Sequence, residues 1–169
     1  VNKNERIVSK KRSIDVIGVG SLILLKNFQR FITIVESLKL QFPQINAVII
    51  GDGPEKDRLE KYINANNLQE NVTLLGSLDR EEVLQYMSKS KILLHTSSFE
   101  SFGFVFAEAL LQKVNIVSLS VGIAKQSNQW KIGETTESLT ASCISFLNSP
   151  LNEDHHIFDV NKTCLLYTS

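Results

Sequence analysis

Residues 96–108 read TSSFESFGFVFAE and predict a strand–loop–helix junction. The apolar run before them, residues 92–94, is typical of a buried parallel strand. Small hydroxyl residues then end the strand, and a helix is expected to begin two or three positions after Glu100. A junction of this kind presents backbone N–H groups to an anion. Gly103 has no Cβ and therefore lets a ligand approach the backbone closely.

Two carboxylates bracket the predicted turn, Glu100 before the helix and Glu108 inside it. Glu108 follows Phe104 by four positions, so the two side chains share one helix face. A carboxylate on a mostly apolar helix at a strand end indicates a ligand hydroxyl as its partner. The alternative is structural, because Glu100 could only favour the positive end of the helix and Glu108 could be solvated. The spacing alone leaves both interpretations open.

The composition is that of one globular domain. A chain of 169 residues with 43% apolar and 21% charged side chains can bury a substantial core. Its 18 basic and 18 acidic side chains give no net charge, so we expect no nucleic-acid partner. Cys143 and Cys164 have neither metal-ligand nor disulfide-scaffold spacing, which indicates a reducing, cytoplasmic compartment. No apolar run approaches the roughly 20 residues that span a bilayer.

Strands and helices alternate along the chain. The sequence predicts five strands, at residues 15–21, 47–50, 72–75, 92–95 and 115–119. It predicts helices at residues 28–38, 55–66, 80–88, 103–112 and 137–147. This alternation predicts an α/β fold with a doubly wound parallel sheet and right-handed crossovers. Ligands of such sheets bind outside the carboxyl ends of the strands, where this chain places its small residues.

Four segments together resemble the C-terminal, nucleotide-sugar-binding domain of retaining GT-B glycosyltransferases, a group that includes glycogen-synthase-like and lipid mannosyl transferases. They are KNF at 26–28, VIIGDGP at 48–54, VTLLG at 72–76, and ESFG at 100–103 followed by Glu108–Ala109. The resemblance covers residues 14–150 and implies one Rossmann-like half of a GT-B enzyme. Residues 1–13 would then be an interdomain linker or tail. Residues 151–169 would be a C-terminal tail or the start of a helix that crosses to the other domain.

The resemblance also implies roles for individual residues. Glu100 would hydrogen-bond hydroxyls of the transferred sugar, and Glu108 would bind the two ribose hydroxyls of the nucleotide. Lys26 would offset the charge that builds on the departing nucleoside diphosphate, so Lys26 and Glu100 are the candidate catalytic residues. The other candidate positions for binding the nucleotide sugar are Ser21, Gly53, Ser97, Phe102, Gly103 and Phe104. The candidate contacts for the base are Leu74, Leu75 and Ser77.

This chain departs from the family pattern at several places, among them Lys113 for Gly and Asn115 for Pro. Ser21 stands where the family usually has Arg, Thr96 stands where it has Pro, and the loop after Gly122 is short. Two functions therefore stay open. One is a retaining transferase that moves a hexosyl group from a nucleoside-diphosphate sugar to a glycan, lipid or small-molecule acceptor. The other is a degenerate, non-catalytic domain that binds nucleotide sugars or acts as a scaffold.

The resemblance implies no cofactor and no metal, because cationic side chains and a helix terminus hold the diphosphate in this family. The chain begins without Met or a signal peptide, so we expect it to be a fragment of a longer protein, and the resemblance implies that an acceptor-binding domain precedes it there. Any membrane contact would occur through that domain, and the fragment alone would be inactive.

A dinucleotide-binding interpretation of Gly18–Gly20 is disfavoured, because Ile23 occupies the place of the third glycine. For His95, a satisfied and partly buried side chain is favoured over a ligand contact.

Overall fold

A computed structural model describes residues 12–101 and 103–149, and the predicted C-terminal tail lies outside them. The described chain contains a six-stranded sheet in which every neighbouring pair is parallel. The strand order is β3-β2-β1-β4-β5-β6. The strands are β1 (Ile14–Val19), β2 (Ala47–Ile50), β3 (Val72–Gly76), β4 (Ser90–His95), β5 (Asn115–Ser118) and β6 (Trp130–Ile132). The predicted α/β, Rossmann-like doubly wound sheet is confirmed.

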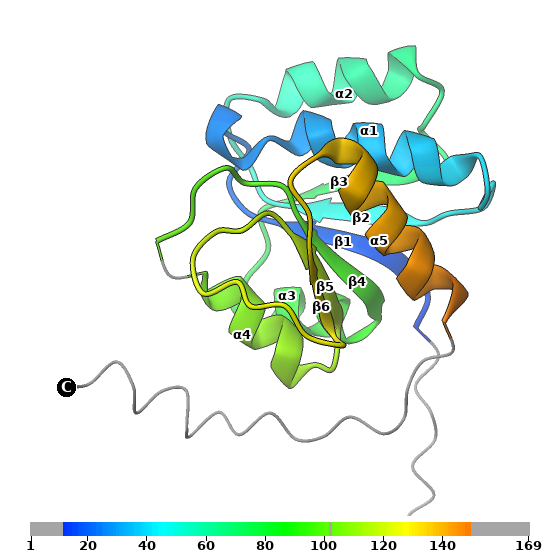
Figure 1. The fold of residues 1–169 in the computed structure, drawn as a ribbon. Helices are drawn as coiled ribbons and strands as arrows, with labels where there is room; N and C mark the ends of the chain where they lie inside the picture. The colour runs from blue at the N-terminus through cyan, green and yellow to red at the C-terminus, as the bar shows by residue number, and fades with distance from the viewer. Residues whose placement is uncertain (1–11, 102, 150–169) are drawn as a thin grey trace, which may run out of the picture.

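Helices cover both faces of this sheet (Figure 1). They are α1 (Phe28–Lys39), α2 (Lys56–Ala65), α3 (Arg80–Ser88), α4 (Phe104–Leu111) and α5 (Thr136–Asn148), with a short 3-10 helix η1 (Leu24–Lys26). Helices α1, α2 and α5 pack on one face, and α3 and α4 pack on the other. Within the described ranges, no helix is long and apolar enough to cross a membrane.

The strands are buried on both faces, which explains their continuous apolar sequences. Successive residues of a strand point to opposite faces, so Val16 joins the core under α1 and Ile17 joins the core over α3 and α4. Helix α1 buries an apolar stripe, and Phe31 at its centre has no exposed surface. Helix α3 begins with a capping box, in which Asp79 and Glu82 satisfy each other's backbone N–H groups.

The prediction of five strands was wrong, because β6 is a sixth. Three residues are too few to show a period, and only Trp130 of the three is buried. The strand forms through its pairing with β5, where Ile116 lies opposite Trp130. The Trp130 Nε1–H also donates to Ser118 Oγ at 2.8 Å. This edge strand is therefore a product of long-range contacts, which local sequence patterns do not report.

The order of the strands creates a switch point between β1 and β4. From β1 the chain winds outward through β2 and β3, and it then crosses back to place β4 on the other side of β1. The loops that follow β1 and β4 therefore leave the sheet in different directions at the same edge. In folds of this type the crevice between two such loops is the usual place for a ligand.

A close backbone contact supports this edge of the sheet. The N–H of Gly51 donates to the carbonyl of Gly76 at 2.8 Å, which ties the end of β2 to the end of β3. A Cβ at Gly51 would lie 1.9 Å from the carbonyl oxygen of Gly20. The loops after β1 and β2 can pack this tightly only because residue 51 has no side chain.

We expect Gly51→Ala to destabilise the fold far more than Gly76→Ala. Both glycines have a positive φ, but a Cβ at Gly76 would meet no atom within 4 Å. Gly76→Ala should therefore lower the free energy of unfolding by only the backbone strain, about 1–2 kcal/mol. Gly51→Ala must also force two loops apart and should lower it by at least about 2 kcal/mol more. Urea denaturation measures both values, and equal losses would contradict the close approach.

Candidate functional site

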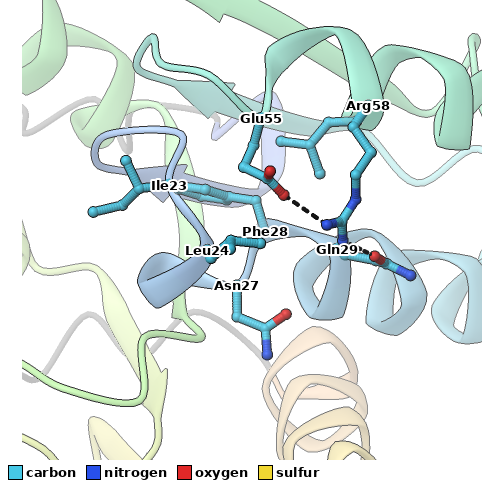
Figure 2. A pocket seen from close by; sticks show the side chains of 8 residues that line it. Ile23, Leu24, Asn27, Phe28, Gln29, Glu55 and Arg58 are labelled. Atoms are coloured by element: carbon cyan, nitrogen blue, oxygen red, sulfur yellow. Dashed lines mark hydrogen bonds and ion pairs between the residues drawn. The ribbon is translucent and has the colours of Figure 1, made fainter.

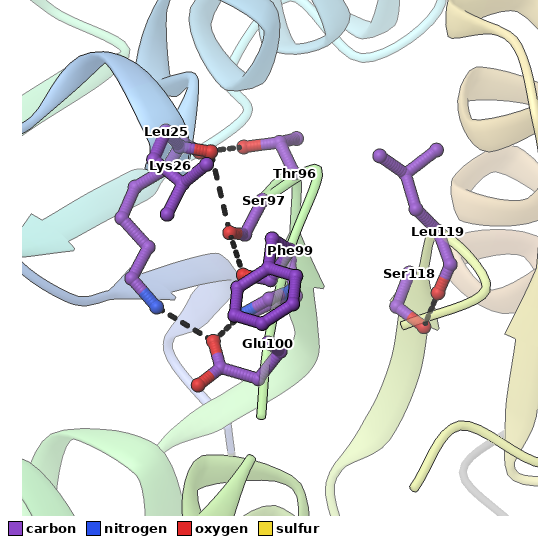
Figure 3. Close-up of polar contacts among 9 residues, drawn as sticks. Leu25, Lys26, Thr96, Ser97, Phe99, Glu100, Ser118 and Leu119 are labelled. Carbon is purple, nitrogen blue, oxygen red and sulfur yellow. Dashed lines mark hydrogen bonds and ion pairs between the residues drawn. The ribbon is translucent and has the colours of Figure 1, made fainter. Parts of the chain in front are cut away.

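Lys26 is the last residue of η1 and is presented at the carboxyl edge of the sheet next to β1. The following residue, Asn27, adopts a left-handed conformation with φ 49° and ends η1. Its side-chain oxygen accepts a hydrogen bond from the backbone N–H of Arg30 at 3.3 Å and so caps α1. One residue therefore ends the short helix and starts the next one. This sharp change of direction leaves the side chain of Lys26 free to extend over the sheet edge (Figure 3).

The loop between β4 and α4 holds η1 in place (Figure 3). The hydroxyl of Thr96 lies 3.0 Å from the carbonyl oxygens of Lys26 and of Asn27 and donates to them. The hydroxyl of Ser97 and the backbone N–H of Ser98 both reach the carbonyl of Leu25, each at 3.2 Å. The carbonyls of Leu25 and Lys26, at the end of η1, lack partners within that helix, and these donors supply them; the carbonyl of Asn27 also accepts from the backbone N–H of Arg30. The backbone of Lys26 is thus fixed by a loop about 70 residues away in the chain.

Lys26 and Glu100 form an ion pair across the switch point. Lys26 Nζ lies 2.6 Å from Glu100 Oε2, and the two side chains are 21% and 18% exposed. His95 Nε2 lies 3.2 Å from the same oxygen. Both contacts are to Oε2, and Oε1 has no protein partner within the residues that the structure describes.

These contacts keep Glu100 ionised. Burial by itself would raise the pKa of Glu100, but the hydrogen bond and charge of Lys26, with a smaller effect of His95, outweigh it and hold the pKa below its ordinary value. At neutral pH Glu100 is therefore a carboxylate that can only accept hydrogen bonds. Its Oε1 atom is suited to bind a hydroxyl group.

Glu108 lies in a different environment. Its Oε1 atom accepts from Arg80 Nε at 3.0 Å, and the side chain of Arg80 is 79% exposed. An ion pair this exposed contributes little to stability. A ligand could therefore replace Arg80 as the partner of Glu108 at low cost.

Gly103 begins α4 and lies beside Glu100. Its φ of +80° is left-handed, and a Cβ there would lie 2.6 Å from the ring of Phe106 and 3.2 Å from Glu100 Cγ. Glycine is therefore required here by the protein's own packing, and the close approach of a ligand stays a prediction. Phe104, the first residue of the helix, is 72% exposed, whereas Phe102 lies outside the described residues.

The remaining predicted positions lie along the same edge without joining the ion pair. Ser21 is exposed in the loop after β1, and Gly53 packs against the carbonyl of Leu22. Leu74 and Leu75 face opposite sides of β3, and Ser77 is exposed just beyond it. Ser97 is 1% exposed, and its hydroxyl also reaches the carbonyl of Phe99 at 2.7 Å. The hydroxyl of Ser97 is thus engaged within the protein and supports the loop.

A hollow of about 290 Å³ lies beside α2 and β3, where Leu74 and Glu60 are among the lining residues, and no cationic side chain of the described residues lines it. A small hollow of about 30 Å³ lies between η1, α1 and α2, where Arg58 pairs with Glu55 and hydrogen-bonds Gln29 (Figure 2). It has room for a water molecule or two and none for a nucleotide. Cys143 is in the core, and burial raises the pKa of its thiol to about 12. No group of three or more His, Cys, Asp or Glu side chains suited to a metal occurs within the described residues.

Three contributors to this site were missed by the sequence analysis. Arg80 was noted only as the start of the helix at residues 80–88, although that start follows the strand at residues 72–75 and so lies at the carboxyl edge. Thr96 was noted only as a departure from a family pattern, and its contacts with a loop about 70 residues away leave no local signal. His95 was interpreted as a satisfied, partly buried side chain, although Glu100 is only five residues further along the chain.

We expect the hydroxyl of Thr96 to stabilise the fold measurably. Thr96→Val keeps the shape of the side chain but leaves the carbonyls of Lys26 and Asn27 without this donor. The free energy of unfolding should fall by about 1–3 kcal/mol. Thr140→Val is the matched control, because the Thr140 hydroxyl only adds a second donor to the helical carbonyl of Thr136. A loss in Thr96→Val no larger than in the control would contradict the role of this contact.

The pKa of Glu100 predicts a pH-dependent contribution to stability. Since the folded pKa lies below the ordinary value of 4.5, the unfolded chain takes up the proton first as pH falls. The stabilisation is therefore complete above that ordinary value and is lost as pH falls through the folded pKa. Between about pH 5.5 and about pH 3, the free energy of unfolding should decrease more for the wild type than for Glu100→Gln. Urea denaturation at both pH values measures the difference, and parallel decreases would show that Glu100 is not held ionised.

Comparisons with known proteins agree with this fold. Residues 2–153 match the family described as "Glycosyl transferases group 1". The chain is 31% identical over 114 residues to the phosphatidylinositol N-acetylglucosaminyltransferase gpi3 subunit of Schizosaccharomyces pombe, a match that covers 68% of this chain and 25% of the relative. The chain thus spans about a quarter of the length of the curated relatives that it matches first.

Two solved structures share the fold. A mutant of S. aureus TarM, in complex with fondaparinux, alpha-GlcNAc-glycerol and UDP, superposes with a TM-score of 0.75 at 20% identity; the match covers 83% of this chain and 30% of TarM. The C-terminal domain of the glycosyl transferase group 1 family protein LpcC from Francisella tularensis gives 0.70 at 19% identity, over 80% of this chain and 76% of that domain. Since the family match covers most of the chain, the chain belongs to the glycosyl transferases group 1 family.

Proposed function

We propose that this chain is the donor-binding domain of a retaining glycosyltransferase that transfers a hexosyl group from a nucleoside-diphosphate sugar to an acceptor. The observation that carries the proposal is the Lys26–Glu100 ion pair across the switch point. It places a cation and an ionised carboxylate where ligands of this fold class bind. Glu108 on α4 adds a second carboxylate whose exposed partner is easily replaced.

Each of these three side chains would bind a different part of the nucleotide sugar. Lys26 has three N–H donors, so it can keep Glu100 and still bind a phosphate oxygen. That charge would stabilise the departing nucleoside diphosphate as the sugar leaves. The free Oε1 atom of Glu100 would accept a hydroxyl of the sugar, and Glu108 would accept the ribose hydroxyls in place of Arg80.

The start of α4 would complete the phosphate site. Backbone N–H groups at a helix start point outward and carry the positive end of the helix dipole. Gly103 keeps this start free of a Cβ next to Glu100. The diphosphate would therefore lie between Lys26 and the first turn of α4, with no metal ion and no further cofactor.

The names of the related proteins suggest which nucleotide sugar to test first. The S. pombe relative is named as an N-acetylglucosaminyltransferase, and the TarM structure contains UDP together with alpha-GlcNAc-glycerol. We therefore put UDP-N-acetylglucosamine first. The acceptor site, and any membrane contact, would belong to a preceding acceptor-binding domain of the full-length protein.

A non-catalytic domain that binds the same ligand is the second candidate. The observation that favours it is Ser21, an exposed hydroxyl where the family usually has the guanidinium of Arg. Loss of one such stabiliser can lower the rate by about 10²–10³-fold. This alternative predicts that the full-length protein binds the nucleotide sugar without transferring it, whereas the enzyme predicts turnover.

Calorimetry with UDP, GDP, ADP and their sugar conjugates tests the proposal. We expect binding of one nucleotide family, with and without EDTA. Glu108→Ala should weaken the binding of the nucleotide and of the nucleotide sugar alike, by about 10–100-fold, because both ligands contain the ribose. Glu100→Ala should weaken only the binding of the nucleotide sugar, because Glu100 would contact the sugar.

Glu36→Ala is the control, since Glu36 lies on the third turn of α1 and away from the sheet edge. It should bind both ligands as the wild type does. Equal effects of Glu100→Ala and Glu108→Ala on the free nucleotide would contradict the assigned roles. Loss of binding in EDTA would contradict the metal-free site.

A further inference from the structure

His95 is the last residue of β4 and contacts Glu100, five residues further along the chain. It is 5% exposed, and its Nε2 atom is 3.2 Å from Glu100 Oε2. Its ring packs edge-on against Phe106, with 4.7 Å between the ring centroids, and Phe106 packs in turn on Trp130 at 4.5 Å. The imidazole is thus held by a strand on one side and by an aromatic stack on the other. The position of the ring is therefore fixed for any group that it contacts.

The direction of the hydrogen bond follows from the charges around it. Burial lowers the pKa of His95, the charge of Lys26 lowers it further, and Glu100 raises it only in part, so the ring is neutral at neutral pH. Glu100 is a carboxylate and carries no proton. The hydrogen must therefore be on Nε2, and Nδ1 is bare. Nδ1 is buried and has no partner within the described residues, which agrees with this tautomer.

We propose that His95 is a positioning residue, whose Nε2–H holds Glu100 Oε2 beside Lys26 and thereby aims Oε1 at a hydroxyl of the bound sugar. The inference rests on the proposed function, because it concerns how the same site recognises the sugar half of its ligand. It assigns to His95 no contact with the ligand. Its effect on the sugar passes entirely through Glu100.

The physical reason is that Lys26 alone cannot orient the carboxylate. An ammonium on a flexible four-carbon stem attracts an oxygen but leaves the carboxylate free to turn about it. A second donor on the same oxygen, from a ring that cannot move, removes that freedom. A binding group must be held to within about 10–20° for its hydrogen bonds to form well, so the second donor bears on sugar recognition.

Three substitutions separate positioning from packing. His95→Gln places an amide N–H near the position of Nε2, whereas His95→Asn ends one bond earlier, near Nδ1. His95→Leu keeps apolar bulk and removes the donor. If His95 positions Glu100, the Gln variant should bind the nucleotide sugar as the wild type does, and the Asn and Leu variants should lose affinity for it to the same extent. If His95 only packs, the three should be ranked by how well they fill the space.

Two measurements on the 169-residue chain read the outcome. The first is the ratio of the dissociation constants of UDP and UDP-N-acetylglucosamine by calorimetry. We expect the Asn and Leu variants to bind the nucleotide sugar about five- to tenfold more weakly and UDP as tightly as the wild type does. The Gln variant should keep the wild-type ratio. The second is the pKa of Glu100 by NMR titration, which needs no ligand. It should rise in Asn and Leu, because they lose both the charge and the hydrogen bond of His95, and should rise less in Gln, which keeps the hydrogen bond.

The outcomes are distinct. An unchanged pKa of Glu100 in His95→Leu, or a Gln variant that matches Leu in both measurements, would overturn the positioning role. Equal weakening of UDP and UDP-N-acetylglucosamine would also overturn it, since a general packing defect acts on both. If the wild type binds no member of the nucleotide panel, the proposed function fails and the sugar role fails with it. The titration would still show whether His95 holds Glu100.

Discussion

The site depends on the hydrogen bonds that tie the β4–α4 loop to η1. Thr96, Ser97 and Ser98 supply donors to carbonyls that the short helix leaves without partners. These contacts join the two chain segments that diverge at the switch point, so they also set the distance between Lys26 and Glu100. Without them, a 3-10 turn of three residues would have little to hold it. Functional geometry here comes from the satisfaction of backbone groups and only then from the ion pair itself.

The two carboxylates of the site differ because their surroundings differ. Glu100 is mostly buried and held by Lys26 and His95, and such a pair gains little net stability after desolvation of both charges. Among the described residues, the carboxylate of Glu108 pairs only with the exposed Arg80. The first carboxylate is fixed and leaves one oxygen free, whereas the second can exchange its partner easily. A binding site that needs one rigid and one adaptable acceptor is built from the same residue type in two environments.

The departures of this chain from its family pattern have opposite effects. With Ser21, the proposed phosphate site lacks the cation that the family resemblance implies there. Thr96 replaces a proline, which has no side-chain donor, with a hydroxyl that bonds the backbone of Lys26 directly. The chain has thus lost one charge but has added a contact that holds the remaining one.

The sequence by itself determined the alternation of strands and helices, the capped start of α3 and the glycine at the start of α4. These features are local: periodicity, capping and the need for a missing Cβ are all encoded within a few residues. Only the tertiary structure decided the sixth strand, the pairing of Arg80 with Glu108 and the contacts of His95 and Thr96. The physical reason is that most of these interactions join segments that are distant in the chain and meet only in the folded sheet, whereas the contact of His95 with Glu100 depends on how the loop after β4 turns. Which oxygen of Glu100 remains free depends on where the donors around it stand in space, and no spacing along the chain records that.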